Sequence, residues 1–162
     1  MKVSLFVAAV ALVVLALGFV MRARARFSGH GPSILVRDVP GAIAQLRQNG
    51  SEHSFLVFMF DPPGKPGAEA INLQLSIDKG RLGLDWVLLS SSNVADRAKV
   101  DALFRKRGQP GKETEMNGVR FLRVEGGDLS ALACAVLADV YELAPDAKLE
   151  TVVEGFQLSA RR

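Results

Sequence analysis

The sequence has few of the residues that metal sites and thiol chemistry need. It contains one cysteine, Cys134, so an intrachain disulfide is excluded. It contains two histidines, His30 and His53, and neither has a second histidine or cysteine at the spacing of metal ligands. Cys134 lies in an apolar helical stretch with no neighbouring base to activate it. We therefore expect no metal, no other cofactor and an ordinary thiol at Cys134.

Motifs of catalysis are also missing from the sequence. The G-x-S-x-G pattern of a serine nucleophile does not occur. The stretch Gly108-Gln-Pro-Gly111-Lys112 differs from a phosphate-binding loop, because Lys106 stands where the first glycine belongs and Glu113 stands where serine or threonine binds Mg²⁺. The sequence therefore predicts no catalytic residue, although a site formed only in three dimensions stays open.

Acidic residues are absent from the first 37 positions, which shifts the charge balance of the whole chain. The pI is about 9.3, a value that suggests nucleic-acid binding. However, 16 of the 20 basic residues and all 17 acidic residues lie in residues 27–162, so that part carries a formal net charge of −1. A nucleic-acid-binding domain normally has a basic face. We therefore expect no nucleic-acid partner.

The N-terminal stretch from Val3 to Met21 is uncharged and contains one hydroxyl side chain, Ser4. As a helix, its 19 residues span about 28 Å, close to the roughly 30 Å of a bilayer core. The sequence thus predicts a single-pass membrane anchor in contact with the lipid bilayer. The alternative is a signal peptide that is cleaved on export, but the apolar run is longer than such peptides usually have.

Basic residues flank the predicted anchor unequally. Lys2 precedes it, and Arg22, Arg24 and Arg26 follow it. By the positive-inside rule, this distribution predicts that the domain behind the anchor faces the cytoplasm. We divide the chain into the anchor with its arginines (residues 1–26), a Gly/Pro/Ser linker (residues 27–37) and one domain (residues 38–162).

Periodicity and turn signals predict an α+β domain behind the linker. Residues 70–77 and 82–89 alternate apolar and polar side chains around Asp78-Lys79-Gly80, which indicates an antiparallel hairpin. Asn117-Gly118 predicts a second hairpin, and Ser91-Ser92-Asn93 offers caps for a helix. The full set is a helix from about residue 38 to 49, strands at 54–60, 70–77 and 82–89, a helix at 94–107, strands at 112–116 and 119–124, a helix at 129–143 and a strand at 149–158. Sequential hairpins imply an antiparallel sheet with helices packed on one face.

This order of elements, with Asn93 as a cap, resembles the αβββαββα layout of class I type III secretion chaperones and the related YbjN-like proteins. The resemblance covers about residues 40–143. It implies a protein-binding module, often dimeric, without catalysis. The predicted anchor and the strand at 149–158 depart from a plain soluble chaperone.

Two features are candidates for recognition of a partner. The Asp61-Pro62-Pro63 turn is a rigid loop that loses little entropy on binding, and Trp86 is of a type favoured at interfaces. Trp86 also lies in an apolar row of its strand, which favours core packing instead. The leading hypothesis is a membrane-tethered, non-enzymatic module that binds a protein partner or a second copy of itself. The alternatives are a structural subunit of a membrane assembly and a small enzyme.

Overall fold

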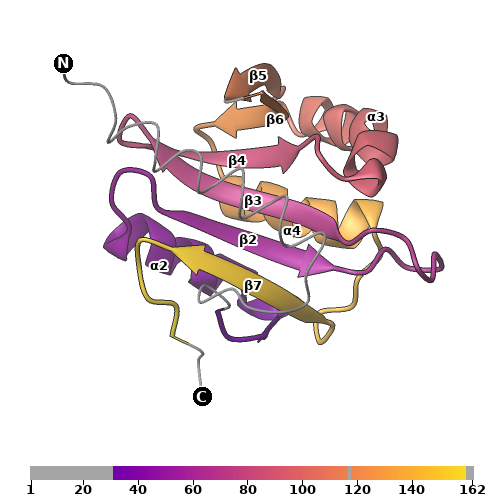
Figure 1. The fold of residues 1–162 in the computed structure, drawn as a ribbon, viewed down its shortest axis with the longest axis horizontal. Coiled ribbons are helices and arrows are strands. Elements are labelled where there is room, and N and C mark those ends of the chain that lie inside the picture. The colour runs from indigo at the N-terminus through magenta and orange to yellow at the C-terminus, as the bar shows by residue number, and fades with distance from the viewer. Residues whose placement is uncertain (1–30, 117, 160–162) are drawn as a thin grey trace.

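The computed structural model describes residues 31–116 and 118–159 (Figure 1). In chain order, the elements are β1 (Ile34–Leu35), η1 (Val36–Asp38), α2 (Val39–Asn49), β2 (Phe55–Phe60), β3 (Ile71–Asp78), β4 (Arg81–Val87), α3 (Ser91–Lys106), β5 (Lys112–Met116), β6 (Val119–Glu125), α4 (Leu129–Ala135), η2 (Val136–Val140) and β7 (Lys148–Glu154). The prediction of an α+β fold with an antiparallel sheet is confirmed, as is the order helix, three strands, helix, two strands, helix and strand.

The seven strands form one sheet in the order β1-β7-β2-β3-β4-β6-β5, and every neighbouring pair is antiparallel. Three of the six neighbouring pairs, β2–β3, β3–β4 and β5–β6, follow one another in the chain. β6 pairs with β4, and β7, the last strand, lies between the first two strands and pairs Val152 with Val57. The N-terminal and C-terminal ends of the domain are therefore joined within the sheet.

The helices α2 and α4 lie behind the strands in the view of Figure 1, and α3 lies beside the ends of β4 and β6; all three helices contribute residues to the same main core. The main core fills the space between the two layers. The strands β2, β3, β4 and β6 contribute alternate residues to this core, as expected from the period of two along a strand. Its largest fully buried side chains include Trp86, Phe58 and Phe104. The opposite side of the sheet has no described helix, and we call it the helix-free face.

The central hairpin forms close to where the alternation predicts it. β3 and β4 pair from Leu73↔Trp86 to Asp78↔Arg81. The two turn residues, Lys79 and Gly80, have φ values of 53° and 69°. Positive φ at both central positions gives a turn whose twist matches that of the strands. The second predicted hairpin also forms, since β5 and β6 pair up to Met116↔Val119.

The helix α3 begins at Ser91, three positions earlier than the predicted start at residue 94. The cap is Ser90, whose hydroxyl accepts a hydrogen bond from the backbone N–H of Asn93 at 3.0 Å. Asn93 is therefore not a cap but the third residue of the helix, and its side chain is buried. A serine at the cap leaves the amide of Asn93 free to bind a neighbouring strand.

The last helix and the last strand are shorter than predicted. The helix expected over residues 129–143 is α-helical only over Leu129–Ala135 and continues as a π-helix over Val136–Val140. Apolar spacing cannot distinguish these two windings over a single turn. The strand expected at residues 149–158 ends at Glu154, because Gly155 takes a φ of 78° and leaves the strand conformation.

The expectation of a single-pass membrane helix is corrected. Within residues 31–116 and 118–159, no helix is both long and apolar enough to cross a membrane. The longest, α3, has 16 residues and carries charged side chains, whereas a span needs about 20 apolar residues. The predicted span from Val3 to Met21 and its flanking Lys2, Arg22, Arg24 and Arg26 lie outside the described residues, as does the predicted orientation.

Candidate functional site: the helix-free face of the sheet

The helix-free face combines an apolar cluster with a buried polar cluster. The apolar cluster comes from β2 and β7, on one side of the face. The polar cluster comes from β3, β4 and β6, beside it. The apolar cluster consists of Phe55, Val57, Met59 and Val152. The polar cluster consists of Gln74, Ser76, Asp85 and Arg123, and the strand register places the two clusters side by side.

The apolar cluster exists because β2 is apolar along its whole length. In the run Phe55–Phe60, alternate residues enter the main core, and the others point to the helix-free face. The four members of the cluster are only 3% to 6% exposed and form a group separate from the main core. A strand that is apolar on both faces is typical of sheets covered on both sides. The run itself is therefore the sequence signal that both faces of β2 are apolar.

An ion pair is the centre of the polar cluster. Asp85 and Arg123 are directly opposite in the register of β4 and β6. The Arg123 Nη1 donates to both carboxylate oxygens of Asp85, at 2.7 and 2.8 Å. Their side chains are 3% and 12% exposed, so the pair is largely removed from water. Burying such a pair is costly unless its remaining groups are also hydrogen-bonded.

Neighbouring groups satisfy the rest of the pair. The Ser76 hydroxyl donates to Asp85 Oδ2 at 2.6 Å, and Arg123 Nε donates to Glu125 Oε1 at 2.8 Å. Burial raises the pKa of Asp85, against the opposing effects of the Arg123 charge and of hydrogen bonds from Ser76 and Gln74. Gly83 leaves room for this arrangement, because a Cβ at that position would overlap the guanidinium of Arg123.

Gln74 is the incompletely satisfied member of the cluster. It pairs with Asp85 in register, and its side chain is buried, with 6% exposure. Among the described residues, its Oε1 has no hydrogen-bond partner. A buried acceptor without a partner costs about 1–3 kcal/mol. A molecule that brought an N–H or O–H group to this point would donate a hydrogen bond to Gln74 Oε1 and recover that free energy. A donor at this position would therefore contribute to the free energy of binding.

The predicted recognition residues do not form one surface. Trp86 is fully buried in the main core, and its indole N–H donates to the backbone oxygen of Asn93 at 2.9 Å. Core packing, the alternative weighed for this residue, is therefore its observed role. Asp61 and Pro63 are exposed in the loop after β2, whereas Pro62 is buried. A hollow at this loop is lined by the loop's own residues, from Asp61 to Ala68.

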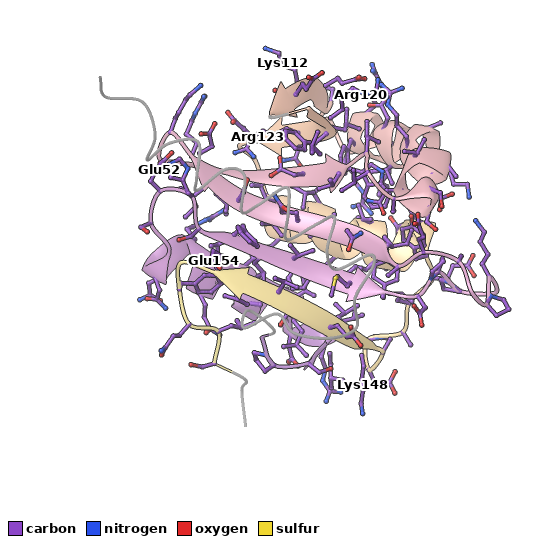
Figure 2. The ribbon with its side chains drawn as sticks, viewed as in Figure 1. Glu52, Lys112, Arg120, Arg123, Lys148 and Glu154 are labelled. Carbon is purple, nitrogen blue, oxygen red and sulfur yellow. The ribbon has the colours of Figure 1, made fainter. Side chains whose placement is uncertain are left out.

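Other groups offer no catalytic arrangement within the described residues. No three metal-ligating side chains converge there. Cys134 is partly buried, and burial raises the pKa of its thiol, which makes it less reactive. A groove beside the β3–β4 turn contains Arg81 and Glu125, which pair with each other at 3.0 Å. Charged residues such as Lys112, Arg120 and Lys148 lie instead around the periphery of the molecule (Figure 2).

Comparison with known proteins does not extend this description. No protein-family model, no curated protein and no solved structure matches the chain. The resemblance to secretion chaperones thus stays a prediction from element order.

Proposed function

We propose that the chain is a non-enzymatic protein-binding module and that the helix-free face is its binding surface. The observation that carries the proposal is the unpartnered Oε1 of Gln74 beside the apolar cluster of Phe55, Val57, Met59 and Val152. Interface centres are typically apolar with a few well-placed polar groups. An orphaned acceptor at such a centre gives the surface a preference for one kind of partner.

The chemistry of the face defines that partner. Its apolar cluster fits a segment of aliphatic or aromatic side chains, and Gln74 Oε1 fits a hydrogen-bond donor on that segment. The Asp85–Arg123 pair is neutral as a whole and has its groups satisfied, so it favours neither an acidic nor a basic partner. The proposed partner is therefore an apolar polypeptide segment that carries one donor. Such segments are also what chaperone-like modules bind, in keeping with the αβββαββα element order.

Site-specific photo-crosslinking tests this proposal. A photoreactive amino acid replaces Met59 on the helix-free face, and a matched variant carries it at Gln48, an exposed position of α2. In cells that express the protein, we expect position 59 to capture one protein through an apolar segment and position 48 to capture none. Val152→Asp, which places a charge in the apolar cluster, should abolish the adduct. Equal capture at both positions, or capture only at position 48, would contradict the proposal.

A further inference from the structure

A groove opens on the side of the sheet opposite the helix-free face, next to the β3–β4 turn. Its walls come from three parts of the chain: the last turn of α2, the β3–β4 turn and the junction between β6 and α4. Its volume is about 520 Å³. Clefts that bind ligands have volumes of roughly 300–1,000 Å³, so the groove is large enough to hold one.

Three aliphatic side chains give the groove an apolar lining. Ile77 and Leu82 are opposite each other in the β3–β4 register and are only partly buried, and Leu129 is the first residue of α4. Leu129 belongs to the main core, and the other two pack against it. Apolar surface that is still in contact with water favours a ligand that removes it from water. The part of a ligand that lies in this groove is therefore apolar.

Exposed backbone forms another part of the lining. Gly126 and Gly127, at the junction between β6 and α4, have no side chains that would shield their main-chain groups. Gln109 holds this junction in place, since its Nε2 donates to the oxygen of Gly126 at 3.0 Å and a Cβ on Gly127 would overlap its side chain. Accessible main-chain groups can pair with the main chain of another polypeptide, whereas a hydrocarbon chain cannot use them. The lining therefore suits a polypeptide better than a lipid tail.

Arg47 supplies a free charge at the rim of the groove. It is exposed in the last turn of α2, and its guanidinium forms no hydrogen bond or ion pair with another described residue. A guanidinium binds a carboxylate through two parallel N–H donors. The group that Arg47 is suited to bind is therefore a carboxylate at the end of an apolar segment.

The acidic side chains around the groove are already bound. Glu125 accepts from Arg81 at 3.0 Å and from Arg123 at 2.8 Å. Glu52 accepts two backbone N–H groups of the β3–β4 turn, and Asp128 accepts the backbone N–H of Ala131 at the start of α4. None of these carboxylates binds the guanidinium of Arg47, so its donors remain for a ligand.

We propose that this groove binds the C-terminus of another polypeptide. Arg47 holds the terminal carboxylate, and the last side chains of that polypeptide are apolar and contact Ile77 and Leu82. The site lies on a different side of the sheet from the helix-free face. The inference therefore goes beyond the proposed function and does not rest on it.

Fluorescence anisotropy of dye-labelled peptides with the full chain tests this site. The probe is a pool of pentapeptides with mixed residues at the first three positions and leucine at the last two. We expect the free acid to bind at least about tenfold more tightly than the C-terminal amide, because only the acid forms charge-assisted hydrogen bonds with Arg47. A pool that ends in two serines should bind at least about tenfold more weakly than the leucine pool, because it buries less apolar area.

Two substitutions of exposed arginines separate the site from general charge effects. Arg47→Gln should remove the preference for the free acid, and it should leave the melting temperature unchanged because its guanidinium has no partner among the described residues. Arg37→Gln, in η1, removes the same charge away from the groove and is the matched control. It should bind the free acid as the unchanged chain does.

Several results would overturn the inference. They are equal binding of acid and amide, no binding of either, and equal losses of binding in Arg47→Gln and Arg37→Gln. Displacement of the peptide by octanoate at lower concentration than by unlabelled peptide would assign the groove to a fatty acid instead. The crosslink from position 59 reports on the other side of the sheet, so the proposed function and this inference fail separately.

Discussion

The side-chain amide of Asn93 in α3 binds both backbone groups of Asn72 in β3. Its Oδ1 accepts from the Asn72 N–H at 3.1 Å, and its Nδ2 donates to the Asn72 oxygen at 2.8 Å. An antiparallel neighbour would make the same pair of bonds. The β3–β4 register ends at Leu73↔Trp86, so the amide continues the pairing for one residue beyond that end. It thereby fixes the first turn of α3 against the sheet.

Replacing Asn93 should therefore destabilise the domain strongly. Asn93→Ala leaves the buried N–H and oxygen of Asn72 without partners, at a cost of about 1–3 kcal/mol for each group left unsatisfied. We expect a loss of about 2–3 kcal/mol in the free energy of unfolding, measured by urea titration. Ser92→Ala, in the same helical turn but only partly buried, is the control and should cost under about 1 kcal/mol. Similar losses in the two variants would count against the role assigned to Asn93.

The Asp85–Arg123 pair should show strong coupling. Arg123→Met leaves the carboxylate of Asp85 buried without its cation and should cost about 3–5 kcal/mol. The double variant Asp85→Leu with Arg123→Met removes both charges and should cost distinctly less than Arg123→Met alone. A double-mutant cycle on unfolding free energies measures this difference. Additive effects of the two substitutions would mean that the pair contributes no interaction energy.

Tyr141 should resist ionisation in the folded protein. Burial and the neighbouring Asp96, which accepts from the phenol at 3.2 Å, raise the pKa of Tyr141 far above its usual value. The unfolded chain ionises near pH 10, so the stability contributed by Tyr141 is complete below that pH and is lost as pH rises above it. Tyr141 is the only tyrosine. Absorbance at 295 nm should therefore rise only together with loss of the Trp86 fluorescence signal, and an earlier rise would refute the assignment.

Glu52 should make the β3–β4 turn sensitive to acid. Its carboxylate accepts from the backbone N–H groups of Lys79 and Gly80 at 2.7 and 2.9 Å, and these bonds lower the pKa of Glu52. Stability from a lowered carboxyl pKa is present above the unfolded value and is lost as pH falls through the folded one. Glu52→Gln should therefore lower the melting temperature at pH 7 and narrow the difference between pH 7 and pH 3. Glu154→Gln, on β7, is the control for loss of one negative charge. If Glu154→Gln lowers the melting temperature as much as Glu52→Gln does, the loss of stability comes from net charge and not from the hydrogen bonds of Glu52.

The sequence predicts the local parts of this fold well, for reasons that particular residues make clear. Alternation of Ile71, Leu73 and Leu75 with polar neighbours defines β3, and the Asp78-Lys79-Gly80 turn defines its partner. The position of β7 between β1 and β2 could not be read in this way, because it depends on pairing between the two ends of the domain. Local patterns carry no information on such distant register.

The candidate site was harder to predict than the fold. Gln74, Asp85 and Arg123 come from three strands, and only the register of β3, β4 and β6 places them together. Individually, each is a polar residue of an alternating strand, for which a solvated position is the ordinary expectation. The wholly apolar run Phe55–Phe60 was the one visible sign that the second face of the sheet is not a solvated surface.

The place of β7 in the sheet has a consequence for the order of events during synthesis. β2 pairs with β7 along Phe55–Met59, and β7 is the last described element in chain order, so it is made after all the other described elements. Until then, one side of an entirely apolar strand keeps its backbone N–H and C=O groups unpaired, which is the kind of edge that associates with other chains. A nascent chain stalled before residue 148 should consequently associate with other chains through this edge of β2.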